Sequence, residues 1–247
     1  MRAVIDKSID DYLAFADDRT RAYLAATPDT YTLLRDVDVL VRDLFASGVL
    51  DASPIGSFLN LNAYYQLMSA VRVAISGHVS AVFPLVRAAL ESACYSHFIG
   101  DDQERQAAWL HRDRTPAEGR TFRRMFGPAI KQTADGLKAI DRDLANYIAA
   151  LYETSITFGA HPNSYSVMRH LEPGEPDKTQ WKVGFVCMYD ETSQEVRAVL
   201  VACAEYGLAI AALAMASKAA EPSLNPWKQR WNAVNEHKNA VAATSSQ

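Results

Sequence analysis

The sequence predicts an all-α fold, a multi-helix bundle into which one small β-hairpin is inserted. Two segments, Val73–Gly100 and Glu191–Ala220, contain few charges over most of their length, which is typical of helices buried in the middle of a protein. Most of the remaining chain places apolar residues at helical spacing along one face. Tyr165–Leu171 and Trp181–Cys187 are instead short and contain strand-forming residues, so they predict the hairpin.

A chain of 247 residues without a linker of domain-boundary length predicts a single domain over residues 1–247. The net charge of −4 gives no overall attraction for nucleic acid or anionic lipid, so binding of a polyanion would need a local patch. The three cysteines, Cys94, Cys187 and Cys203, show no metal-ligand spacing. Their odd number, and an N-terminus that meets acidic residues too early for a secretion signal, predict a cytoplasmic protein.

The first two helices are expected over Ile5–Ala26 and Asp29–Ala46. Between them, Thr27 is the predicted N-cap of the second helix and Pro28 its first helical residue. The second helix has an apolar stripe opposite a charged face, which indicates an amphipathic surface helix. Its stripe consists of Leu33, Leu34, Val37, Leu40, Val41 and Leu44.

A loop over Gly48–Gly56 leads to a third helix, Phe58–Ser76, and then to the central helix within Val73–Gly100. Pro84 either kinks the central helix or indicates that it starts later, near Ala81.

The segment after the central helix is the most polar part of the chain, and it predicts two short helices, Asp102–Arg112 and Pro116–Phe126. A further helix is expected over Asp141–Phe158, with Gly159 ending it. A turn follows at His161–Ser164.

The hairpin is expected over residues 165–187, with a polar loop at Glu172–Gln180. The long helix Glu191–Ala220 should pack beside the central helix. A last amphipathic helix opens at Asn225, and Ala242–Gln247 are expected to fray.

Arg87 and Glu91 are the two charges of the central helix, spaced so that they lie on one face and can touch. Charges so near the middle of the segment would be costly in lipid, so we expect no membrane span. The order Arg then Glu is the weaker orientation, which suggests a third partner on another helix. The pair is a buried structural lock, the lining of a polar cavity, or a contact exposed at an oligomer interface.

His161 is held just past a helix end and directly before Pro162, where the backbone is biased toward extended geometry. It is a candidate general acid or base, or else a cap for the preceding helix. His78 and His97 flank the central pair and favour cap or core roles. The sequence has no metal-ligand spacing of histidines with carboxylates and no nucleotide-binding or hydrolase motif, so no metal and no cofactor are expected.

The stretch from His111 to Phe126 interleaves arginines with aromatic residues, a mixture that can grip phosphates and stack bases. Two acidic residues interrupt it, and a charged helix face is commonly just solvated. The candidate nucleic-acid contacts are Arg112, Arg114, Arg120, Arg123 and Arg124.

The segment Gly77–Glu91 resembles a recurrent motif of uncharacterised bacterial helical proteins, in which an apolar helix begins with small residues and then has Arg-x-x-x-Glu. In those proteins a later helix ends in a tyrosine, a hydroxyl residue and a histidine followed by small polar residues. Tyr152, Thr157 and the turn from His161 through Asn163 match this second element, although a serine is more typical at the position of Thr157. The resemblance groups Arg87, Glu91 and His161 at one site, with His78, Tyr152, Thr157 and Asn163 as candidate ligand contacts.

A more distant similarity is to HEPN-like domains, many of which are metal-independent ribonucleases with an Arg-x(4–6)-His motif. The first histidine after Arg87 is His97, outside that spacing, so the similarity is one of analogy. We therefore expect a binding or interaction module with a buried Arg87–Glu91–His161 site, and a homodimer as one form. The alternative is a HEPN-like ribonuclease or phosphate-ester-processing enzyme, with His161 as acid/base and Arg87 stabilising an anion. A small anionic ligand or RNA is the corresponding partner.

Overall fold

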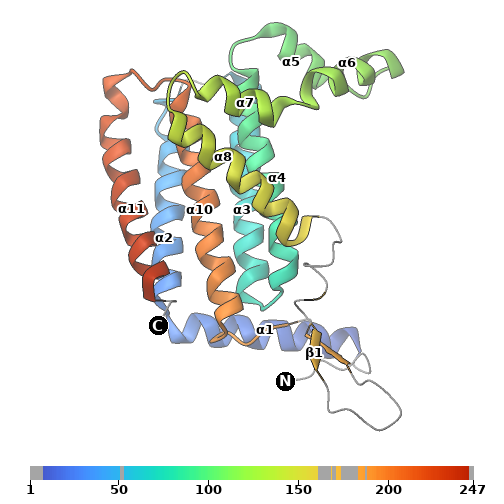
Figure 1. Ribbon diagram of the computed structural model, residues 1–247, viewed down its shortest axis with the longest axis vertical. Coiled ribbons are helices and arrows are strands. Elements are labelled where there is room, and N and C mark those ends of the chain that lie inside the picture. The colour runs from blue at the N-terminus through green and yellow to red at the C-terminus, as the bar shows by residue number, and fades with distance from the viewer. Residues whose placement is uncertain are drawn as a thin grey trace.

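The computed structural model describes residues 8–50, 53–160, 168, 171–173, 183–186 and 188–244, and these are mostly helical, which confirms the all-α fold (Figure 1). The elements are α1 (Ile9–Ala26), α2 (Asp29–Ala46), α3 (Pro54–Ile75), α4 (Val79–Ile99), α5 (Gln103–Leu110), α6 (Pro116–Phe126), α7 (Ala129–Leu137), α8 (Arg142–Ser155), a π-helical turn η1 (Ile156–Ala160), β1 (Leu171–Pro173), β2 (Val183–Phe185), α10 (Gln194–Ala216), a 3₁₀ turn η2 (Pro222–Leu224) and α11 (Asn225–Ala243).

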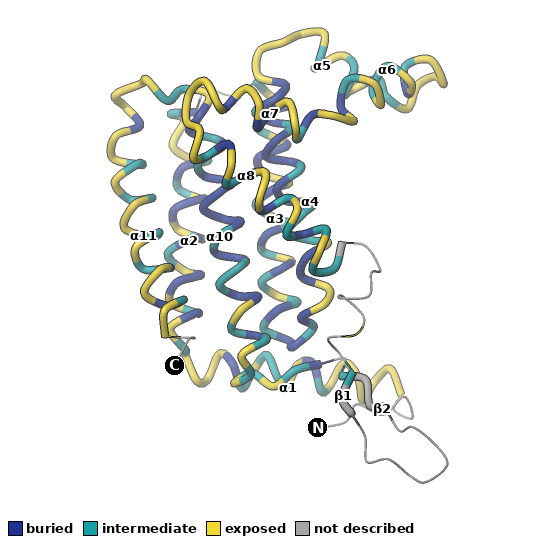
Figure 2. Tube along the Cα trace, viewed as in Figure 1, coloured by how far each residue is buried: buried dark blue, intermediate teal, exposed yellow. Residues whose placement is uncertain are grey.

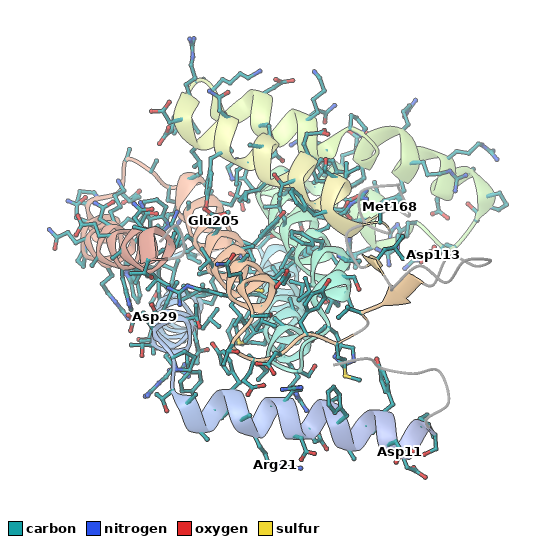
Figure 3. The ribbon with its side chains drawn as sticks, turned by 60° about the horizontal axis from the view of Figure 1, so that its bottom comes forward. Asp11, Arg21, Asp29, Asp113, Met168 and Glu205 are labelled. Carbon is teal, nitrogen blue, oxygen red and sulfur yellow. The ribbon has the colours of Figure 1, made fainter. Side chains whose placement is uncertain are left out.

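Helices α2, α3, α4, α10 and α11 stand side by side as an upright bundle (Figure 1). Helix α10 packs against the other four, and α4 packs most extensively against α3, so α4 and α10 are inner helices as predicted. Figure 2 shows buried residues along most of α4 and α10. Helix α8 crosses the bundle diagonally, and α1 crosses beneath its ends with Asp11 and Arg21 pointing away from the bundle (Figure 3).

Most helices begin at a side chain that accepts a hydrogen bond from a backbone N–H three residues later, which satisfies a donor that the helix itself leaves unpaired. These capping residues are Ser8, Ser53, Asp102, Thr115, Asp141 and Ser193. The sharp turn between α3 and α4 depends on Gly77, whose φ is 86°. A Cβ there would lie 2.4 Å from the carbonyl oxygen of Tyr189, so only glycine fits.

The boundary between α1 and α2 differs from the prediction by one residue. Thr27 is the left-handed C-cap of α1, with φ 44°, and Pro28 is the extended N-cap of α2, so neither has its predicted role. Helix α4 begins at Val79, so Pro84 lies inside it and the later start near Ala81 is wrong. Helix α11 continues through Ala243, so the predicted fraying from Ala242 begins too early.

Three helices rather than two lie in the polar segment after α4. The additional helix, α7, buries Ala129, Thr133, Ala134 and Leu137 against α4 and α8. Its buried residues recur at helical spacing, so the sequence contains the apolar face of this short helix and the prediction overlooked it.

The two strands form a minimal antiparallel pair, with Leu171 opposite Phe185 and Pro173 opposite Val183. β1 shares only Leu171 with the first predicted strand and continues into the predicted loop Glu172–Gln180, so those bounds are wrong, whereas β2 lies within the second predicted strand. Most of the predicted hairpin over residues 165–187 lies outside the described residues, so the hairpin as a whole stays a prediction.

Of the described helices, α10 has the length and composition to cross a membrane, and 72% of its most apolar window is buried inside the bundle. Its apolar surface is therefore covered by α2, α3, α4 and α11.

Candidate functional site

Arg87 and Glu91 form the predicted ion pair on α4, with Arg87 Nε 2.9 Å from Glu91 Oε1. The side chain of Arg87 is 22% exposed and that of Glu91 is 33% exposed. The prediction that the pair is buried is therefore wrong. The pair lies at the edge of the bundle, where water reaches both side chains.

The predicted third partner is Tyr152 on α8. Arg87 Nη2 donates a hydrogen bond of 3.1 Å to the Tyr152 hydroxyl, and the guanidinium carbon lies 5.1 Å from the centre of the Tyr152 ring. Partial burial alone would lower the pKa of Arg87, but the hydrogen bond and charge of Glu91, with Tyr152, raise it overall. The guanidinium is thus held from two helices and stays charged.

The π-helical turn η1 continues α8 beyond Tyr152 and packs against the first half of α4. The Phe158 ring stacks on Phe83 with centroids 5.4 Å apart. A Cβ on Gly159 would lie 3.0 Å from the Ser80 carbonyl oxygen, so the backbone of the turn approaches α4 closely. Thr157 is exposed on this turn. His161 and Asn163 lie outside the described residues, so the predicted convergence of His161 with Arg87 and Glu91 stays a prediction.

His78 is at the opposite end of α4 from the polar segment and does not join this site. Its Nε2 is 2.5 Å from the Tyr12 hydroxyl and its Nδ1 is 2.8 Å from Ser76 Oγ. Burial lowers the pKa of His78, and the charge of Arg72 adds to this effect. Nine residues of helix separate it from Arg87, roughly 14 Å along the axis at 1.5 Å per residue. His78 therefore ties α1 to the α3–α4 turn and is not a ligand contact of the Arg87 site.

His97 lies near the end of α4, beside a cavity of about 90 Å³ between α3, α4 and α10. Burial lowers the pKa of this imidazole, which has a hydrogen bond to the backbone of Leu213, while its Nδ1 is buried without a partner. Ser96 lines the same cavity, but its hydroxyl donates to the Gly56 carbonyl, 2.9 Å away. The cavity is large enough for only a few water molecules.

The two described cysteines are unsuited to nucleophilic chemistry. Both are buried and free, and burial raises the pKa of Cys203 to about 12 and that of Cys94 further. Cys187 lies outside the described residues. No group of histidine, cysteine and carboxylate side chains that could hold a metal ion occurs in the part of the chain that the structure describes.

A larger cavity, of about 520 Å³, lies between α8, α10 and α11, and sequence reasoning missed it. Its lining includes the apolar Leu144, Met215 and Trp231 and the charged Asp143 and Lys228. Volumes of this size are typical of small-molecule sites. No motif indicated it, because its lining combines α8 with the later helices α10 and α11.

The five arginines of the candidate nucleic-acid surface divide into two groups. Arg112 packs over Trp109 and Phe122 and pairs with Asp113, whereas the others are exposed on α6 and the turn before it.

Comparison of the chain with family models, with curated proteins and with solved structures gave no match.

Proposed function

We propose that the protein is a binding module and that Arg87, held by Glu91 and Tyr152, recognises an anionic group at the edge of the bundle. The observation that supports this most directly is the exposure of the pair, because a sealed pair would serve only as a lock. A guanidinium presents several N–H donors in a rigid fork and suits carboxylate or phosphate recognition. Arg87 Nε donates a hydrogen bond to Glu91 and Nη2 donates one to Tyr152, so the guanidinium is oriented before an anion binds.

The alternative is a metal-independent enzyme that acts on a phosphate ester, with His161 as acid/base and Arg87 stabilising the anion. One observation favours it: Gly159, two residues before His161, lies against Ser80 and Phe83, a turn or two from Arg87 on the same helix. We keep the binding module as first choice because the contacts of Arg87 with Glu91 and Tyr152 orient the guanidinium for anion recognition, and the sequence has no established catalytic motif.

Thermal unfolding with increasing inorganic phosphate, against sodium chloride at equal ionic strength, tests the binding module. Phosphate should raise the melting temperature of the wild type, and Arg87→Gln and Glu91→Gln should reduce that rise. Arg42→Gln is a matched control, because Arg42 is also paired at i, i+4, with Asp38 on α2. Equal stabilisation of the wild type and Arg87→Gln would contradict the proposal.

The enzyme alternative is tested separately with single-stranded RNA in the presence of EDTA. If the wild type cleaves the RNA and His161→Ala does not, the protein is a ribonuclease rather than a binding module. No cleavage, together with phosphate binding, supports the module.

A further inference from the structure

Helices α5 and α6 project from one end of the bundle (Figure 1). We call the segment Gln103–Phe126 the arm. Figure 2 shows the arm as a mixture of exposed and intermediate residues, and the buried residues of α6 are Gly119 and Phe126. Phe126 packs edge-on against Tyr95 and Phe98 of α4, with ring centroids 5.2 and 5.5 Å apart. The arm is therefore anchored to the bundle by its own small apolar cluster.

The arm carries four exposed arginines, Arg114, Arg120, Arg123 and Arg124, for which no carboxylate lies within salt-bridge distance among the described residues. Most other described arginines are paired with an acid. These are Arg19, Arg21, Arg42, Arg72, Arg87, Arg105, Arg112, Arg197 and Arg230. In a chain of net charge −4, positive charge without a partner is thus concentrated on this arm.

Folding alone does not account for this concentration. Arg120, Arg123 and Arg124 are spaced i, i+3 and i+4 on α6, so they share one face, where like charges destabilise a helix. The helix dipole favours the arginines of the last turn, Arg123 and Arg124, but not Arg120 or Arg114, which lie nearer the positive end of the helix. A bound polyanion would remove the repulsion.

The aromatic residues of the arm are not available to stack bases. Phe122 stacks on Phe126 with centroids 4.8 Å apart, and the Arg112 guanidinium covers both Phe122 and Trp109. Recognition here would therefore use phosphates rather than bases. Contacts to phosphates carry no direct sequence information, so binding would not depend on the sequence of the nucleic acid.

We propose that the arm binds the phosphate backbone of a nucleic-acid duplex without regard to its sequence. A duplex presents one phosphate per roughly 3.4 Å of each strand. The arginines on α6 extend from Arg120 to Arg124, roughly 6 Å along the helix or little more than one turn, and can meet this charge density. The acidic remainder of the chain would confine contact to the arm. This proposal does not depend on the function of the Arg87 site.

The test is fluorescence anisotropy with two labelled 20-base-pair RNA duplexes of unrelated sequence and their DNA counterparts, at several salt concentrations. Affinity should be equal for the two sequences. If four phosphates are contacted, the slope of log affinity against log salt should be about −3.6, a loss of roughly a hundredfold between 50 and 200 mM salt. Arg120→Gln or Arg124→Gln should each reduce the slope by about 1, and the Arg114/Arg120/Arg123/Arg124→Gln variant should abolish binding.

Arg35→Gln and Arg142→Gln are the matched controls, because these exposed arginines also have no acid within salt-bridge distance in the described ranges but lie outside the arm. Both controls should bind duplexes as the wild type does. Undetectable duplex binding at 50 mM salt, or unchanged binding by the fourfold variant, would overturn the proposal. Binding only to single strands, to polyglutamate, or to vesicles containing 30% phosphatidylserine would also overturn it and assign the arm a different partner.

Discussion

Arg87 of the bundle and the pair Arg120 and Arg124 of the arm differ in whether an acid compensates their charge. On α4, Arg87 is held by Glu91 and by Tyr152 of α8, and it is partly covered. On α6, Arg120 and Arg124 are exposed one turn apart without an acidic partner in the described structure. The comparison teaches that a lone arginine in an apolar segment can be oriented by an acid and a tyrosine. Arginines in a polar segment can instead be exposed without an acid beside them in the described structure.

The largest expected effect is on the anchor of the arm. Phe126→Ala removes a fully buried ring from the cluster with Tyr95 and Phe98, and such changes cost about 3–5 kcal/mol. Because this cluster is separate from the main core, the loss should fall on the arm first. Hydrogen exchange should show loss of protection in α5 and α6 while α4 and α10 stay protected. Uniform loss across all helices would mean that arm and bundle unfold as one unit.

A smaller effect is expected at the ion pair. Arg87→Ala should cost about 1 kcal/mol, because the pair is partly exposed and screened by water. A sealed pair would instead cost about 3–5 kcal/mol when one partner is removed. Urea denaturation of Arg87→Ala, with Arg42→Ala as the control for an exposed i, i+4 pair, distinguishes the two values. A loss of more than about 3 kcal/mol in the free energy of unfolding would show that the Arg87–Glu91 pair has the structural role of a buried ion pair.

Acidification should weaken the bundle modestly. Burial lowers the folded-state pKa of His78 and His97 below 6.5, so the unfolded chain takes up protons first as the pH falls. Their contribution is present above pH 6.5 and is lost as the pH falls through the folded-state pKa. Melting at pH 7.5 and at pH 5.5 should differ less in the His97→Asn variant than in the wild type. An unchanged difference would show that other groups dominate.

The smallest effect on stability is expected on the arm. The Arg120→Gln/Arg124→Gln variant removes like charges one helical turn apart, so stability should stay the same or rise by about 0.2–0.5 kcal/mol. Thermal melts at low salt measure it. A clear loss of stability would show that these arginines have a structural role.

Much of the fold follows from local signals in the sequence. Helices α2 and α6 have the predicted bounds, because an apolar stripe in α2 and the Thr115-Pro116 start of α6 are strong signals. The contact of Arg87 with Glu91 follows from helical spacing, and Tyr152 was a predicted site residue.

The remainder depends on tertiary packing that no local pattern contains. The partial exposure of Arg87 depends on how α8 packs on α4, because Tyr152 of α8 contacts the guanidinium and leaves 22% of the Arg87 side chain exposed. Likewise, helical periodicity predicts α5 and α6 but not that they leave the bundle and expose Arg120 and Arg124. The cavity lined by Leu144, Met215 and Trp231 arises only when three separate helices meet.

The most direct test of the contrast between bundle and arm compares Arg35→Gln, on α2 of the bundle, with Arg120→Gln/Arg124→Gln for duplex affinity between 50 and 200 mM salt. The arm variant should bind more weakly and lose about two units of salt slope, while Arg35→Gln should bind as the wild type does. Loss of duplex binding in Arg35→Gln with normal binding by the arm variant would contradict the account.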